Sequence, residues 1–402
     1  MTSKPSLRHG RPYLAIPGPS VMPDRVLQAM HRPAPNIYAG EVVDLTASLV
    51  PDLKYVAGTE HDVAIYIANG HGVWEAALSN VVAPGERVLV PATGRFGHGW
   101  SEMAAGIGAE AQILDFGKRS PWDLERIADA LQADSERKIK AVLAVHVDTS
   151  TSIRNDVAGL REVLDETGHP ALLMVDCIAS LACDRVTMDA WGADVLVTGS
   201  QKGLMTPPGL GFVFFGPKAA AARQAMPRVS RYWDWVPRAN PEFYYEYFGG
   251  TAPTHHLFAL RAALDMIREE GIENTWARHA TLARAIWAAA EAWGADGPME
   301  LNMPDPAFRS HAVTALRIGA PHGTALRDWV DQNLGLTLGI GLGMAPPGDP
   351  AWHGFFRIGH MGHVNGHMIL GLLGGIDAAL KALEIPHGDG ALEAASTVIA
   401  GL

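Results

Sequence analysis

Residues 193–203 read ADVLVTGSQKG, and this segment indicates both a strand and a reactive side chain. Its apolar part, residues 195–197, is short and bounded by small residues, which is typical of a buried strand. The strand breaks at Gly199, and Lys202 follows among small residues, just before a PPG turn at 207–209. A lysine held on constrained backbone at the end of a strand suits the formation of an imine with a carbonyl group.

A second apolar run, residues 172–175, ends in a carboxylate, Asp176. A buried aspartate and a buried lysine on neighbouring strand ends are the two protein groups that a pyridoxal phosphate site needs. The lysine would hold the cofactor aldehyde, and the aspartate would keep the pyridine nitrogen protonated so that the ring withdraws electrons. The alternative is ordinary: most lysines that follow strands are solvated, and aspartates at strand ends often form turns.

Composition restricts the kinds of protein that fit this sequence. The 402 residues favour two domains, and 48% hydrophobic with 19% charged residues are typical of a well-buried globular enzyme. A formal net charge of −11 argues against nucleic acid or an anionic membrane as a partner. Two cysteines, Cys177 and Cys183, are too few for a disulfide framework or a cysteine-based zinc site. The sequence shows neither a secretory signal nor an apolar run of the ~18 residues that a membrane span needs, so we expect a soluble, cytoplasmic protein.

Between about residue 63 and residue 215 the chain alternates strand-like and helix-like segments. This order predicts a mainly parallel sheet with helices on both faces. The expected strands are residues 63–68, 87–90, 110–114, 141–145, 172–176, 195–197 and 211–215. The expected helices are residues 72–82, 97–107, 123–132 and 156–168. We therefore predict an α/β fold built around a sheet of these strands.

The rest of the chain predicts a smaller α+β domain. Its expected helices are residues 253–270, 276–293, 324–334 and 368–383, and its expected strands are residues 312–316 and 355–358. Pro5, Pro12, Pro17 and Pro19 indicate an extended N-terminal arm. The predicted limits are 1–20 for the arm, 21–268 for the large cofactor-binding domain and 269–402 for the small domain.

Ligands of open α/β sheets bind outside the carboxyl ends of the strands, and four polar groups of this sequence fall at such ends. Residues 69–72, NGHG, could place backbone N–H groups and a helix N-terminus around a phosphate, or form a simple tight turn. Residues 146–151, HVDTST, could bind a ligand or cap the next helix. Asp176 and Lys202 form the third group. Arg357 could grip a carboxylate, although a lone arginine on a strand is usually part of an ion pair or a structural clamp.

Two rival motifs are weaker. His360, His363 and His367 fall at helical spacing, but glycines interrupt any helix there and no carboxylate joins them, so we expect no metal. Residues 339–343, GIGLG, look like the start of a dinucleotide loop, yet no helix opens directly after them.

With these pieces in order, the sequence resembles the class V aminotransferases of pyridoxal-phosphate fold type I, most closely their serine–glyoxylate and alanine–glyoxylate branch. The motifs that carry the resemblance stand at residues 17–20, 69–71, 146–151, 175–176, 199–202, 207–209, 251–253 and 357–360. Several motifs in one order are far more specific than any one of them. The resemblance implies a large domain with a mainly parallel seven-stranded sheet, followed by a smaller C-terminal α+β domain.

The resemblance also implies roles for individual residues. Lys202 would form the Schiff base, Asp176 would pair with the ring nitrogen, and Arg357 would clamp the substrate carboxylate. The other residues implied to bind the cofactor are Asn69, Gly70, His71, Phe96, Thr149, Ile178, Gln201 and Thr251. Of these, Thr251 would reach the cofactor phosphate of the neighbouring subunit, which implies a homodimer with shared sites.

Some positions differ from the family pattern. Phe96 stands where relatives stack an aromatic ring, often Trp, on the cofactor, and Thr149 would bond near the ring's 3-hydroxyl. The departures are Asn69 for a hydroxyl residue, Asp148 for Glu, Ser152 for Gly and Phe248 for a Tyr. Residues 36–40 lie where many serine–glyoxylate enzymes carry a His-Arg pair, so the amino donor stays open.

The implied activity is a ping-pong transamination, in which serine or alanine gives its amino group to glyoxylate or pyruvate. Lys202, once released, would act as general base at the substrate Cα. An aspartate–glyoxylate, ureidoglycine–glyoxylate or pyridoxamine–pyruvate aminotransferase is the alternative within the family. A cysteine desulfurase would need a reactive cysteine on a mobile loop, whereas Cys177 and Cys183 lie close to the Asp176 strand. A metal- or nucleotide-binding regulatory protein is the alternative from another class.

Overall fold

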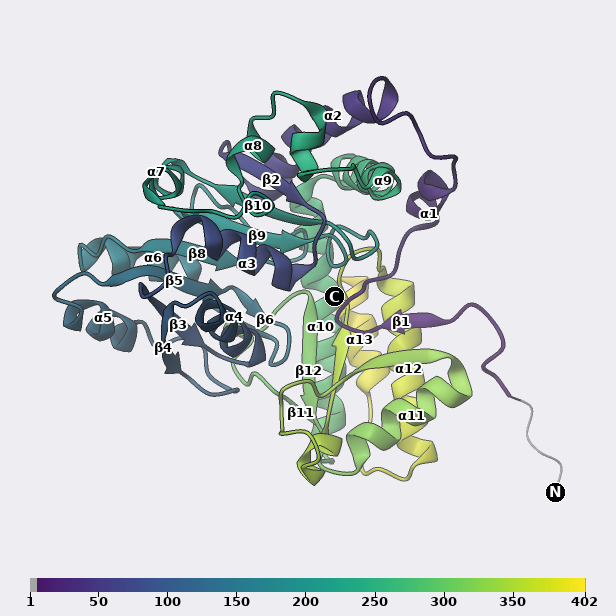
Figure 1. Ribbon diagram of the computed structural model, residues 1–402. Coiled ribbons are helices and arrows are strands. Elements are labelled where there is room, and N and C mark those ends of the chain that lie inside the picture. Colours follow the sequence, from purple (N-terminus) through teal and green to yellow (C-terminus); the bar gives the residue numbers. More distant parts are fainter. Residues whose placement is uncertain (1–5, 402) are drawn as a thin grey trace.

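The computed structural model describes residues 6–401, and its centre is a seven-stranded sheet in the order β2-β10-β9-β8-β5-β3-β4 (Figure 1). The strand bounds are Asp62–Tyr66 (β2), Arg87–Ala92 (β3), Glu110–Asp115 (β4), Ile139–Val145 (β5), Leu172–Asp176 (β8), Val195–Gly199 (β9) and Gly211–Phe215 (β10). Strand β10 runs antiparallel to β2 and β9, and every other pair in the sheet is parallel. The predicted mainly parallel, seven-stranded sheet is therefore confirmed.

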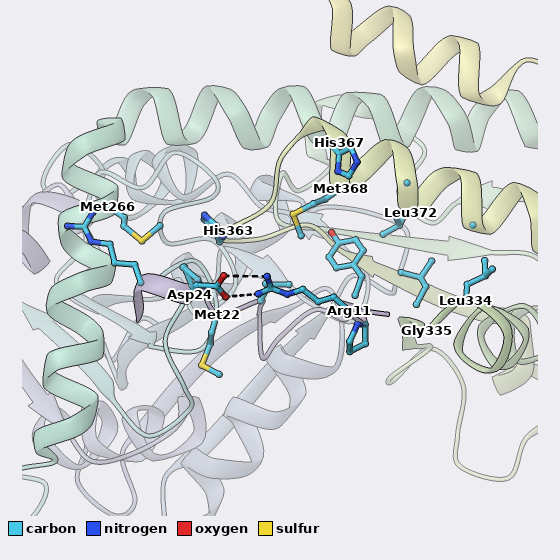
Figure 2. A pocket seen from close by; sticks show the side chains of 18 residues that line it. Arg11, Met22, Asp24, Met266, Leu334, Gly335, His363, His367, Met368 and Leu372 are labelled. Carbon is cyan, nitrogen blue, oxygen red and sulfur yellow. Dashed lines mark hydrogen bonds and ion pairs between the residues drawn. The ribbon is translucent and has the colours of Figure 1, made fainter. Parts of the chain in front are cut away.

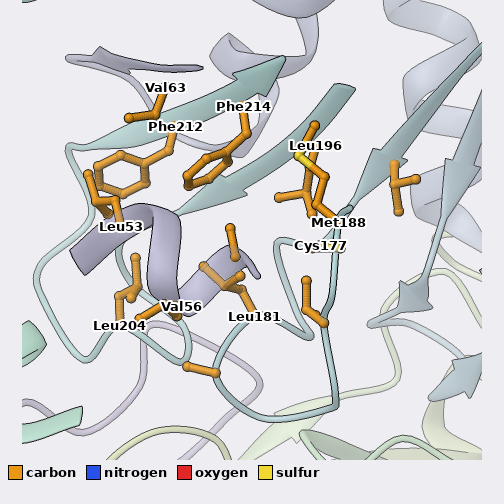
Figure 3. Close-up of a cluster of buried hydrophobic side chains, with 14 of the residues drawn as sticks. Leu53, Val56, Val63, Cys177, Leu181, Met188, Leu196, Leu204, Phe212 and Phe214 are labelled. Carbon is orange, nitrogen blue, oxygen red and sulfur yellow. The ribbon is translucent and has the colours of Figure 1, made fainter. Parts of the chain in front are cut away.

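Helices cover both faces of this sheet because alternate strand residues point to opposite sides. One face packs against α3 (Gly70–Val81), α4 (Arg95–Gly106) and α7 (Pro217–Ala225). The other face packs against α2 (Glu41–Ala57), α5 (Leu124–Ala133), α6 (Val157–Glu166) and α9 (Thr254–Glu270). Figure 3 shows the second of these cores, in which Phe212 and Phe214 of β10 lie near Leu53 and Val56 of α2.

A second sheet of five strands forms the C-terminal part of the molecule, in the order β1-β13-β14-β12-β11. The strands are Tyr13–Ala15 (β1), Glu300–Leu301 (β11), Val313–Arg317 (β12), Leu336–Ile340 (β13) and Phe355–Gly359 (β14). The helices around it are α10 (Ile272–Gly294), α11 (His322–Leu334), α12 (Gly366–Ala382) and α13 (Ala391–Ala400). The purple β1 of Figure 1 comes from the N-terminal arm and pairs in parallel with β13.

Shorter elements complete the chain. They are α1 (Asp24–Met30), β6 (Val147–Asp148), β7 (Ile153–Arg154), α8 (Val236–Ala239) and the 3-10 turns η1 (Tyr244–Phe248), η2 (Pro306–Phe308) and η3 (Pro350–Gly354). Among the helices of residues 6–401, none combines the length and apolar character that crossing a bilayer requires. Pro5 of the predicted arm lies outside the described residues, and the domain limits 1–20, 21–268 and 269–402 stay a prediction.

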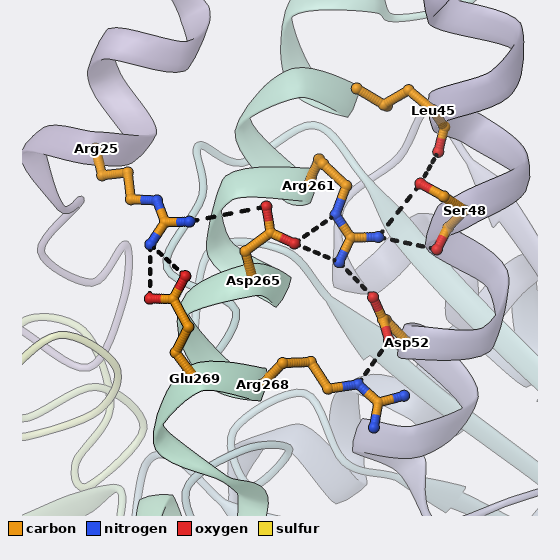
Figure 4. Close-up of polar contacts among 8 residues, drawn as sticks. All are labelled: Arg25, Leu45, Ser48, Asp52, Arg261, Asp265, Arg268 and Glu269. Atoms are coloured by element: carbon orange, nitrogen blue, oxygen red, sulfur yellow. Dashed lines mark hydrogen bonds and ion pairs between the residues drawn. The ribbon is translucent and has the colours of Figure 1, made fainter.

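Ion pairs hold α2 and α9 together on the second face (Figure 4). Asp52 of α2 pairs with Arg261 and with Arg268 of α9, whose Nε lies 2.6 Å from Asp52 Oδ1. On the far side of α9, Arg25 of α1 reaches Glu269 at 2.7 Å. Burial raises the pKa of Asp52, but the two guanidinium groups outweigh it and hold that pKa below its ordinary value.

Candidate active site

Asp176 and Lys202 meet at one edge of the large sheet. Strands β8 and β9 are parallel neighbours, with Asp176 opposite Val197, so their carboxyl ends lie side by side. Asp176 is the last residue of β8, and Lys202 follows the end of β9 at Gly199. A cavity of about 180 Å³ lies between them. It is lined by Asn69, Gly70, His71, Trp74, Phe96, Val147, Thr149, Asp176, Ile178, Ala179, Gln201 and Lys202.

Most of the predicted site residues line this one cavity. They are Asn69, Gly70, His71, Phe96, Thr149, Asp176, Ile178, Gln201 and Lys202. Arg357 and Thr251 do not line it. Sequence reasoning missed Trp74, because the apolar pattern of α3 does not distinguish a buried hydrogen-bond donor from an ordinary core ring.

Lys202 is half-buried, and the backbone of the N-terminal arm lies against its amine. Its Nζ contacts the backbone carbonyl of Pro17, and a Cβ added at Gly18 would clash with the same nitrogen. Burial and, to a smaller extent, the charge of Arg357 together lower the pKa of Lys202 to about 8, although Asp176 acts in the opposite direction. Near neutral pH a useful share of the amine is therefore unprotonated, which is the form that attacks a carbonyl carbon.

The carboxylate of Asp176 accepts one hydrogen bond on each oxygen. The backbone N–H of Ile178 donates to Oδ1 at 2.7 Å, and the indole N–H of Trp74 donates to Oδ2 at 3.0 Å. Burial raises the pKa of Asp176 to about 7, and the two donors oppose that rise. A cation placed beside the carboxyl would return it to the ionised form, since opposite charge favours the carboxylate.

The start of α3 forms one wall of the cavity. The side chain of Asn69 caps the helix by accepting from the N–H of Gly72 at 3.2 Å. A Cβ at Gly70 would lie 2.6 Å from Ile178 Cδ1, so glycine leaves the room that the wall needs. Burial lowers the pKa of His71, and the charge of Arg95 lowers it further. A neutral imidazole at a helix N-terminus leaves that end free to bind an anion through its backbone N–H groups.

Asp148 places Phe96 at the cavity. Its Oδ2 accepts from the backbone N–H of Phe96 at 2.8 Å, and its Oδ1 accepts from the N–H of Ser150 at 2.9 Å. The carboxylate thereby caps the start of α4, where negative charge is favourable. A Cβ at Gly94 would come within 2.5 Å of Asp148, so this close approach requires glycine.

Arg357 joins the small sheet to the loop that carries Thr149. Its Nη1 donates to the carbonyl of Thr149 and its Nε donates to the carbonyl of Ile340, both at 2.7 Å. Within residues 6–401 its Nη2 makes no hydrogen bond to a side chain or carbonyl. Burial lowers the pKa of Arg357 to about 10, and Asp148 opposes that change. The group is charged at neutral pH and keeps donors for an anion.

Gln201 and Thr251 complete the predicted set. The Oε1 of Gln201 is buried and has no hydrogen-bond partner among the described residues, which indicates an acceptor that a ligand would satisfy. Together with the amine of Lys202 and the carboxyl of Asp176, this free acceptor fits a pyridine ring with polar substituents. Thr251 is exposed, follows η1 and does not line the cavity of its own chain.

A wider groove of about 730 Å³ lies between the N-terminal arm and α12 (Figure 2). Its lining is largely apolar, and an ion pair joins Arg11 and Asp24 across it at 2.6 Å. His363 and His367 line this groove, whereas His360 is buried and bonds Thr314 at 2.9 Å. Across residues 6–401, no three His, Cys, Asp or Glu side chains gather closely enough to hold a metal ion.

Comparisons with known proteins agree with this geometry. The sequence profile of the Aminotransferase class-V family matches residues 13–348. The chain is 35% identical to a serine–glyoxylate aminotransferase of Methylorubrum extorquens, across 97% of this chain and 96% of that protein. Its fold matches a ureidoglycine–glyoxylate aminotransferase of Bacillus subtilis with TM-score 0.85 at 26% identity, covering 98% and 99% of the two chains. An alanine–glyoxylate aminotransferase of Nostoc sp. matches with TM-score 0.83 at 27% identity, covering 94% and 98%.

Proposed function

Because this chain belongs to the class V aminotransferase family and is a transaminase, we propose that it uses pyridoxal phosphate to move an amino group from serine or alanine to glyoxylate or pyruvate. The observation that carries this proposal is that Asp176, which is buried, and Lys202, which is half-buried, line the same cavity. The similar proteins with serine, alanine and ureidoglycine in their names share glyoxylate, which supports glyoxylate as the acceptor.

The residues around the cavity fit the proposed cofactor. Lys202 would hold its aldehyde carbon, Asp176 would pair with its ring nitrogen, and Gln201 would bond a ring substituent. The start of α3 would bind the phosphate, and Phe96 would lie against the ring. When bound, pyridoxal phosphate supplies an electron-withdrawing ring that stabilises negative charge at the substrate Cα.

Two residues of this chain would then handle the substrate. Arg357 binds the substrate carboxylate through its free N–H donors, which fixes the direction of the bond between Cα and its hydrogen. The Nζ of Lys202, with a pKa lowered to about 8, would take the Cα proton of the amino donor, and in the second half-reaction it would deliver a proton to the Cα of the amino acid formed from the acceptor. The amino group that is transferred comes from the first substrate and is passed to the second. The two substrates therefore bind one after the other.

The proposal includes a homodimer in the cytoplasm. Thr251 is exposed and would serve the phosphate of the partner subunit, and the exposed rings of Phe243 and Tyr245 lie nearby in the sequence. Exposed aromatic side chains are enriched at protein interfaces. Cys177 and Cys183 are both free, which supports a reducing compartment.

The cofactor assignment is tested by chemical trapping. The purified protein should show a visible absorbance band that borohydride removes, and peptide mapping should place the reduced adduct on Lys202. Lys202→Ala should abolish both the adduct and turnover. A colourless protein that gains no adduct after incubation with pyridoxal phosphate would contradict the proposal.

The amino donor is tested by half-reactions. Each candidate (serine, alanine, aspartate, ureidoglycine and pyridoxamine) is mixed with the enzyme while the visible band is followed in a stopped-flow instrument. The physiological donor should bleach the band fastest, and glyoxylate should restore it faster than pyruvate. If aspartate, ureidoglycine or pyridoxamine outpaces serine and alanine, the donor assignment changes to that compound.

A further inference from the structure

Trp74 makes a contact that packing alone does not require. The side chain is 1% exposed and lies one turn after the start of α3, near the carboxyl ends of the strands. Its indole N–H donates to Oδ2 of Asp176 at 3.0 Å, across 102 positions of sequence. The same ring meets the ring of His71 edge-on, with centroids 4.9 Å apart, so the indole is held from two sides.

The Asp176 carboxylate has two hydrogen-bond donors. One is a backbone N–H, and the other belongs to a side chain. The N–H of Ile178 belongs to the backbone and would remain whatever the side chains are. Among residues 6–401, Trp74 is the side chain that donates to this carboxylate. Both donors are neutral, so they orient the carboxylate without removing its attraction for a positive partner.

We propose that Trp74 is a positioning residue for transamination: its indole N–H fixes the plane of the Asp176 carboxylate and stabilises its ionised form, so that the carboxylate can pair with a protonated ring nitrogen. This inference rests on the proposed cofactor for its role in catalysis. The effect of Trp74 on Asp176 stands without the cofactor, because both side chains make their contact within the protein.

Trp100 offers a matched control. Its ring stacks on that of Trp74, with centroids 5.8 Å apart and planes 13° apart, and it is fully buried. Its Nε1 has no hydrogen-bond partner among the described residues. Trp100→Phe and Trp74→Phe therefore remove the same atoms from the same core cluster, but only the second removes a donor from Asp176.

The test is the titration of Asp176 in the full-length protein after removal of any cofactor. Infrared difference spectra follow the stretch of the protonated carboxyl against pH, and its loss in Asp176→Asn assigns the band. Trp74→Phe should move the midpoint upward by about one pH unit or more, the worth of one hydrogen bond to a charged group. Trp100→Phe should leave the midpoint unchanged.

Equal shifts in the two variants, or no shift in Trp74→Phe, would overturn the proposal. If Trp74→Phe does not fold, benzothienylalanine at position 74 keeps the shape of indole and replaces its N–H with sulfur; the same upward shift is expected. In the enzyme loaded with pyridoxal phosphate, Trp74→Phe should lower kcat about tenfold or more with the KM of the amino donor unchanged. Because the infrared midpoint needs no cofactor, it separates a failure of this inference from a failure of the cofactor assignment.

Discussion

The close approach of the Lys202 amine to the backbone at residue 18 requires glycine there. Its φ of +90° is a conformation that disfavours a side chain, and a Cβ there would meet the amine of Lys202. Gly18→Ala should therefore reduce the pyridoxal phosphate retained after gel filtration, and activity should fall about tenfold or more. Gly10→Ala is the control, since a Cβ at Gly10 meets no atom within 4 Å. Equal retention in both variants would show that the amine has room to move.

Asp176 makes the cofactor-free protein sensitive to pH. Its pKa is raised from the ordinary 3.8 to about 7, so the folded protein keeps a proton that the unfolded chain releases. The free energy of unfolding should therefore fall as pH rises from about 4 to about 7, by up to about 4 kcal/mol from this group. Asp176→Asn cannot titrate, so the difference in unfolding free energy between wild type and variant should decline over the same range. Urea denaturation at several pH values measures it, and parallel curves would contradict the raised pKa.

Residues at the ends of predicted strands could be assigned to the site from sequence, because the carboxyl edge of a parallel sheet collects them. Asp176 and Lys202 were found in this way, whereas Gln201 was named through the family resemblance. Trp74 was missed, since its partner lies 102 positions away and nothing in the local pattern of α3 distinguishes a buried donor from a buried core ring. The link from Arg357 to the loop of Thr149 is missed for the same reason, because it joins two separate sheets.

At the scale of elements, the strands of the large sheet could be predicted from their apolar runs. Several elements near the two ends of the chain could not. Strand β1 has three residues and gains its identity only by pairing with β13. Helix α2 contains Pro51, which argues against a helix from sequence alone, yet its buried residues pack on the sheet and outweigh that cost. Helix α13 packs against α10 from the far end of the chain.

The ion pairs between α2 and α9 share one carboxylate, that of Asp52. Asp52→Asn should lower the free energy of unfolding by about 1–2 kcal/mol at pH 7, because two arginines lose their shared partner. The pKa of Asp52 is depressed, so its contribution is complete above the unfolded pKa and is lost as pH falls through the folded value. The gap between wild type and variant should therefore close as acid protonates Asp52, at a pH below the ordinary pKa of 3.8. Asp129→Asn, at an exposed position on α5, should match wild type throughout; a gap that persists in acid would contradict the ion-pair explanation.

At the scale of the whole molecule, shared sites can be tested by mixing subunits. Thr251→Glu places a negative charge where the partner's phosphate is proposed to sit, so it should impair activity, and its exposure makes the fold tolerant of the change. When this variant is unfolded and refolded with an equal amount of Lys202→Ala, hybrid dimers would contain one intact site. Activity should then return to about a quarter of wild type, because half of the dimers are hybrid. No recovery would mean that Thr251 serves its own subunit or none.

The pairing of β1 with β13 also bears on how the protein is made. Tyr13 leaves the ribosome early, but its partner Leu336 is synthesised about 320 residues later. Residues 13–18, which carry β1 and contact Lys202, therefore stay unpaired through most of translation. Long-range pairings of this kind are slow to form. The enzyme can therefore gain its catalytic competence only near the end of synthesis.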